Sequence, residues 1–112
     1  MQLLPIRLAG FLFIALAFCP LINASEEGDD LRAADAQLNT SYQEALEVMP
    51  TEAAKTKLRQ AQRAWVAFRD AEIALNAELP GASGNILKML QTELTETRTK
   101  QLQALAEAAQ AE

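Results

Sequence analysis

The sequence has no histidine and one cysteine, and its aromatic residues are four Phe, one Trp and one Tyr in 112 residues. The lack of histidine excludes Ser-His-Asp and Cys-His catalytic arrangements and zinc sites built on histidine. The cysteine, Cys19, lies in an apolar N-terminal segment, and loss of that segment would also exclude a disulfide and a cysteine nucleophile. We therefore expect a chain that is held together by packing and carries no metal or cofactor.

Residues 1–24 are typical of a secretory signal peptide. One cation, Arg7, precedes an apolar run over residues 8–18, and Ala24 is a small residue at the expected cleavage position. The run is shorter than the roughly 20 residues that a membrane span needs, and no second such run follows. We predict cleavage after Ala24, a periplasmic or secreted protein without a membrane span, and one domain over residues 25–112. A retained N-terminal anchor is the alternative.

Basic residues are fewer than acidic ones. The chain has 10 Lys and Arg against 15 Asp and Glu, a formal charge of -5, and loss of Arg7 with the signal takes the charge to -6. Nucleic acids and anionic membrane surfaces would be repelled by such a field, whereas cationic proteins would be attracted to it.

Helix boundaries are marked by prolines, glycines and capping residues. Asp29 or Asp30 is expected to cap the first helix. Pro50 should end that helix near residues 48–49, because a residue before proline disfavours the helical conformation. The second helix, which Thr51 can cap, is expected over residues 52–79, where neither Gly nor Pro interrupts a run of good helix formers.

A turn over residues 80–85 separates the second helix from the third, which Ser83 or Asn85 can cap. The tail over residues 106–112 holds only Ala, Gln and Glu, and we expect it to fray. The short connections predict an all-α fold, a compact antiparallel three-helix bundle. Apolar residues recur at helical spacing on each helix: Leu31, Leu38, Tyr42, Ala45 and Met49; then Leu58, Ala61, Trp65, Phe68 and Leu75; then Ile86, Leu87, Leu90, Leu94, Leu102 and Leu105.

Two charged residues lie on the same face of the second helix as its two aromatic residues. Arg69 and Glu72 follow Trp65 and Phe68 at helical spacing. We interpret the two aromatic residues as core. The neighbouring polar side chains are expected to tie the second helix to the third, and Glu72 could bridge Arg69 to Arg98. These tying residues are Arg69, Glu72, Thr95 and Arg98.

Three segments together resemble the LprI-type lysozyme inhibitor family. They are residues 38–42, residues 62–72 and residues 94–98, and their order and spacing match across roughly residues 30–105. The resemblance implies a small, exported, all-helical domain, with lysozyme inhibition as the role of some members. The motif residues of this chain are Leu38, Asn39, Tyr42, Gln62, Trp65, Phe68, Arg69, Asp70, Glu72, Thr95 and Arg98.

The chain departs from this family pattern at two positions. Many relatives carry cysteines where this sequence has Ile73 and Leu90. If those cysteines form a bridge, the resemblance implies that Ile73 and Leu90 are neighbours and that apolar contact replaces the covalent link.

Two other features have competing interpretations. The acidic residues 26–30 could hold a hard cation, but they lack the alternating ligands and turn glycine of a calcium loop, so a solvated leader is favoured. The turn over residues 80–85 could insert into an enzyme cleft, but its length is typical of a plain connector.

Three function classes follow. The first is an inhibitor of lysozyme-type hydrolases, whose common host forms are cationic and would be steered to an acidic domain. The second is a non-inhibitory envelope module that binds another protein or a cell-wall component through a helical face or through the loop. The third, an enzyme, is disfavoured because no pair of acid and base residues is placed as a cleft would require.

Overall fold

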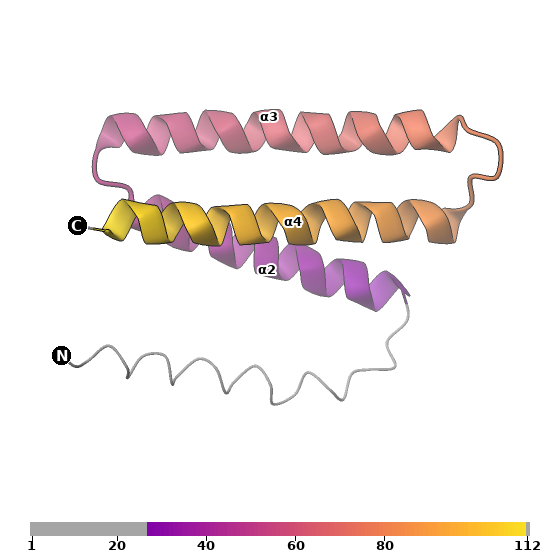
Figure 1. Ribbon diagram of the computed structural model, residues 1–112, viewed down its shortest axis with the longest axis horizontal. Helices are drawn as coiled ribbons and strands as arrows, with labels where there is room; N and C mark the ends of the chain where they lie inside the picture. Colours follow the sequence, from indigo (N-terminus) through magenta and orange to yellow (C-terminus); the bar gives the residue numbers. More distant parts are fainter. Residues whose placement is uncertain (1–26, 112) are drawn as a thin grey trace.

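The computed structural model describes residues 27–111, so the predicted signal peptide lies outside the described residues. Three helices make up this part: α2 (Glu27–Val48), α3 (Glu52–Ala77) and α4 (Gly84–Gln110). α3 runs antiparallel to both other helices, and α4 lies between α3 and α2 (Figure 1). The all-α three-helix prediction is confirmed. None of the described helices is long and apolar enough to cross a membrane.

Most helix boundaries follow the predicted local signals. α2 ends at Val48, as Pro50 requires. The Thr51 and Ser83 side chains cap α3 and α4 by accepting hydrogen bonds from the Ala54 and Ile86 amides, at 3.0 and 3.2 Å.

Two predicted boundaries were wrong. α2 begins at Glu27, so Asp29 and Asp30 lie inside the helix instead of at its cap. α3 ends at Ala77, before the predicted Leu79, because the residue preceding Pro80 avoids the helical conformation. The turn that follows contains Gly81 at a φ of 87°, a left-handed conformation that glycine adopts without strain.

α4 packs along α2 far more extensively than α3 packs on either helix. The buried residues that line this contact are mostly small: Ala34, Ser41 and Ala45 on α2, with Thr95 and Thr99 on α4. Small side chains allow two helix backbones to approach closely. Of the apolar row predicted for α4, Leu102 is fully buried, whereas Ile86 and Leu105 are exposed.

The hydrophobic core lies where the second half of α2, the first half of α3 and the second half of α4 meet. Leu38, Ala45, Leu58 and Leu102 are buried there. The side chains packed against these four are Tyr42, Leu46, Met49, Trp65 and Ala106. α4 stays helical through Gln110, and Ala106 contacts the core, so fraying of the tail stays a prediction.

Leu102 tests the position of this core. Leu102→Ala should lower the free energy of unfolding by about 2–5 kcal/mol, because Leu102 is fully buried and truncation leaves a cavity. Leu105→Ala is the control on the same helix, and it should cost about 1 kcal/mol or less because Leu105 is 42% exposed. If urea unfolding shows the same loss of unfolding free energy for both variants, this position of the core is contradicted.

Candidate functional site

The aromatic and charged side chains of the motif segment separate in the structure. Trp65 is half-buried and packs against the core, as predicted. Phe68 is 50% exposed, so its assignment to the core was wrong. The two residues lie on one stripe of α3, but only Trp65 packs against the core.

Arg69 ties α3 to α2. Its Nη1 lies 3.8 Å from Asp35 Oδ1 on α2, and its Nε lies 3.4 Å from Oδ1 of the adjacent Asp70. The guanidinium carbon also lies 5.1 Å from the centre of the Trp65 ring, within the range of a cation–π contact. The Arg69 side chain is largely buried in this arrangement, which accounts for a charge beside the core.

Arg98 provides the link between α3 and α4. Its Nε donates a hydrogen bond of 2.9 Å to Gln62 Oε1 on α3, and its Nη1 donates one of 3.2 Å to Gln101 on the next turn of α4. Its Nη2 is buried without a hydrogen-bond partner among the described residues. Burial lowers the pKa of the Arg98 guanidinium, because desolvation disfavours its charged form.

Glu72 does not bridge the two arginines, contrary to the prediction. In the described part of the chain its carboxylate forms no ion pair, and its backbone carbonyl accepts a 2.8 Å hydrogen bond from Asn76. Asp35 on α2 takes the place predicted for Glu72 as the partner of Arg69. Nothing in the sequence pattern singled out Asp35, because the partner helix of Arg69 depends on the tertiary arrangement.

Thr95 is fully buried, but it does not form the predicted polar tie. Its hydroxyl has no hydrogen-bond partner among the described residues, whereas its backbone carbonyl accepts a 3.0 Å bond from Thr99. Leu38 is buried in the core and Asn39 is exposed. Ile73 and Leu90 are both half-buried, and their direct contact stays a prediction.

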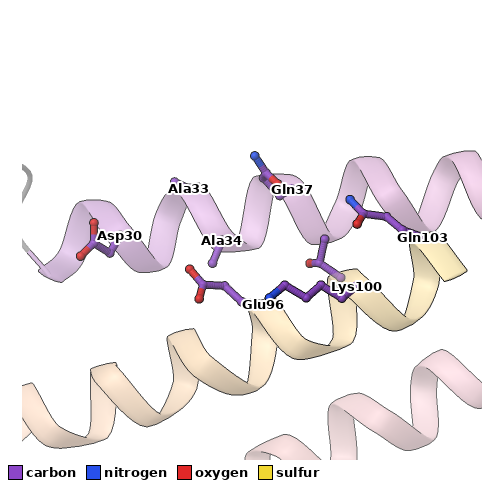
Figure 2. Close-up of a pocket in the computed structure, with 8 residues that line it drawn as sticks. Asp30, Ala33, Ala34, Gln37, Glu96, Lys100 and Gln103 are labelled. Carbon is purple, nitrogen blue, oxygen red and sulfur yellow. The ribbon is translucent and has the colours of Figure 1, made fainter. Parts of the chain in front are cut away.

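The first groove, here called the α2–α4 groove, runs between these two helices on the side of α4 away from α3 (Figure 2). It encloses about 340 Å³. Asp30 and Glu96 supply carboxylates, and Lys100 is the cation that lines it. Gln103 spans the two helices by donating a 3.4 Å hydrogen bond to Ser41. The other lining residues are Ala33, Ala34, Gln37 and Thr99.

The second groove, here called the α2–α3 groove, has the opposite charge balance. It encloses about 540 Å³ and contains Arg59 and Arg63 against one carboxylate, that of Asp70. Tyr42 and Gln62, both motif residues, also line it, together with Val66 and Ala67. The sequence pattern indicates these motif residues but not the grooves, because a groove depends on how two helices pack against each other.

The chemistry of the α2–α4 groove favours binding over catalysis. A glycosidase needs two carboxyl groups across a cleft, one of them in an environment where it can hold a proton. Asp30 and Glu96 are both exposed, and they lie on an open helical face. Within the described residues no group of three or more Asp, Glu, His or Cys side chains is placed to hold a metal ion.

Known proteins share sequence similarity with this chain. A family model described as lysozyme inhibitor LprI matches residues 24–102. An uncharacterized protein of Rhizobium meliloti (strain 1021) is 34% identical over 97 residues, which covers 72% of this chain and 69% of that protein. No solved structure matches the chain.

Substitution of Thr95 tests whether its buried hydroxyl lacks a hydrogen-bond partner. Thr95→Val should raise the free energy of unfolding by about 1 kcal/mol, because it replaces a buried hydroxyl that has no partner with a methyl group of similar size. Thr97→Val, at an exposed position of the same helix, should change stability by about 0.5 kcal/mol at most. A clear loss of stability in the Thr95 variant would contradict the unpaired hydroxyl.

The Arg98–Gln62 link can be tested separately. Gln62→Leu should lower the free energy of unfolding by about 1–3 kcal/mol, because it removes the acceptor of a hydrogen bond from a partly buried charge. Gln60→Leu, at an exposed position on α3, is the matched control and should be nearly neutral. If thermal unfolding shows the same change for both variants, this link does not hold α3 to α4.

Proposed function

Because the chain belongs to the LprI lysozyme inhibitor family, we propose that it is an exported binding protein that inhibits lysozyme-type cell-wall hydrolases. The family match over residues 24–102 is the observation that carries this proposal. The signal-like residues 1–24, which end where the family match begins, support export to the periplasm or the medium. An inhibitor of a cell-wall hydrolase has to act outside the cytoplasm, so both parts of the proposal agree.

The α2–α4 groove is the surface we propose for the enzyme. Its carboxylates, Asp30 and Glu96, outnumber its one cation, Lys100. Acidic residues also line the neighbouring grooves on these helices, Glu93 beside Asp30 and Glu44 beside Gln37. Such a surface attracts a cationic lysozyme and speeds encounter, an effect that weakens as salt is added.

Steric occlusion is the mechanism that this surface supports. A glycoside hydrolase must bring the sugar chain between its two catalytic carboxyl groups. A rigid pair of helices laid across the cleft denies the glycan that position without any chemistry of its own. Pairing of inhibitor carboxylates with basic residues at the rim of the cleft would fix the orientation, and charge-assisted bonds of this kind are the stronger ones.

A non-inhibitory envelope module is the second candidate, and the α2–α3 groove favours it. Arg59 and Arg63 with Tyr42 form a surface that suits an acidic or sugar-bearing partner better than a cationic enzyme. Recovery from envelope extract of a partner unrelated to lysozyme, lost in Arg59→Glu/Arg63→Glu, would support this candidate.

A cell-wall lysis assay tests the inhibitor proposal. The exported chain should slow the clearing of a cell suspension by a cationic lysozyme, and Asp30→Lys/Glu96→Lys should raise the inhibition constant about tenfold or more at low salt. The matched control is Glu47→Lys/Glu52→Lys, which changes the net charge equally but lies outside the α2–α4 groove.

The results of this assay test the inhibitory role and the proposed contact surface separately. Unchanged lysis at a large excess of the wild-type chain contradicts the inhibitory role itself. Inhibition that weakens equally in both double variants contradicts the α2–α4 groove as the contact surface and leaves only a net-charge effect.

A further inference from the structure

One long face of α3 is exposed and has a regular sequence pattern. Its residues recur at alternating steps of four and three positions, and every one of them is exposed. In order they are Lys57, Ala61, Ala64, Phe68, Ala71 and Leu75 on α3, and Glu78, the residue that directly follows the helix. We call this set the α3 seam. α3 forms one edge of the three-helix arrangement, so none of the described helices lies beyond it (Figure 1).

The spacing of the α3 seam is that of a helix that pairs with another helix. Alternating three- and four-residue steps keep side chains along one line and are the repeat of a coiled coil. Phe68 and Leu75 are 50% and 57% exposed, which is a large apolar area for a helix that has few contacts with the rest of the chain. The alanines between them leave room for the large side chains of a partner.

The two ends of the seam carry opposite charges. Lys57 lies at its first position and Glu78 at its last, with Phe68 close to the midpoint. A second α3 in antiparallel orientation would bring Lys57 of each copy beside Glu78 of the other, and the two contacts are related by a twofold axis. A parallel arrangement would instead place like charges together, which is unfavourable.

We propose that the α3 seam pairs with the same seam of a second copy of this chain, antiparallel, to form a twofold-symmetric dimer. The two Phe68 rings then meet near the twofold axis, each flanked by Ala64 and Ala71 of the other copy, and Leu75 packs near Ala61. A self-complementary patch of this kind is what a twofold interface requires, because both partners present the same surface. The proposal does not rest on lysozyme inhibition, since the α2–α4 groove lies on the other side of α4 and stays free.

The association of the exported chain, measured by sedimentation over a concentration series, tests this proposal. The wild-type chain should dimerise reversibly, and Phe68→Glu should raise the dimer dissociation constant about a hundredfold or more, because two buried rings are replaced by charges. The circular dichroism spectrum of Phe68→Glu should remain that of a helical protein, since Phe68 is half-exposed within one copy. Met89→Glu, at a 60% exposed position outside the seam, is the control and should leave dimerisation unchanged.

Charge-reversal variants test whether the two α3 helices pair antiparallel or parallel. Lys57→Glu alone and Glu78→Lys alone should each raise the dissociation constant about two- to tenfold, and the double variant Lys57→Glu/Glu78→Lys should restore it. A chain that stays monomeric at the highest attainable concentration overturns the proposal. So does a dimer that survives Phe68→Glu, or one whose charge variants show no rescue.

Discussion

The close packing of α4 on α2 is the contact on which the rest of the structure depends. Buried alanine, serine and threonine side chains line it, and Leu102 anchors its end in the core. With few aromatic residues in the chain, stability comes from the close approach of helices together with a small core of leucines. α3 is then added through Leu58, Trp65 and two polar links, those of Arg69 and Arg98.

The helices could be predicted from the sequence because residues close to their ends determine where each helix begins and stops. Pro50 and the capping residues Thr51 and Ser83 act within one turn of the chain, so neighbours in space do not alter their effect. Burial was harder to predict. The apolar stripe of α3 indicates a direction, but it does not show how much of that stripe a partner helix covers, and Phe68 lies on the part left exposed.

The motif residues serve the fold more than they define a binding site. Arg69 reaches α2, Arg98 reaches α3, and Trp65 completes the core, so three of the most distinctive side chains hold helices together. The surfaces that we propose for recognition lie mostly outside the motif: no motif residue lines the α2–α4 groove, and Phe68 is the motif residue in the α3 seam. This division explains why a sequence can indicate the family while its contact surface becomes visible only in the folded chain.

Amide hydrogen exchange on dilute protein tests the central role of the α2–α4 contact most directly. We expect the slowest exchange in residues 38–45 of α2 and 95–102 of α4, where buried side chains surround the backbone. Residues 68–77 of α3 should exchange faster, since their large apolar side chains face outward. Equal protection of all three helices, or the strongest protection in the second half of α3, would contradict a fold organised around the α2–α4 pair.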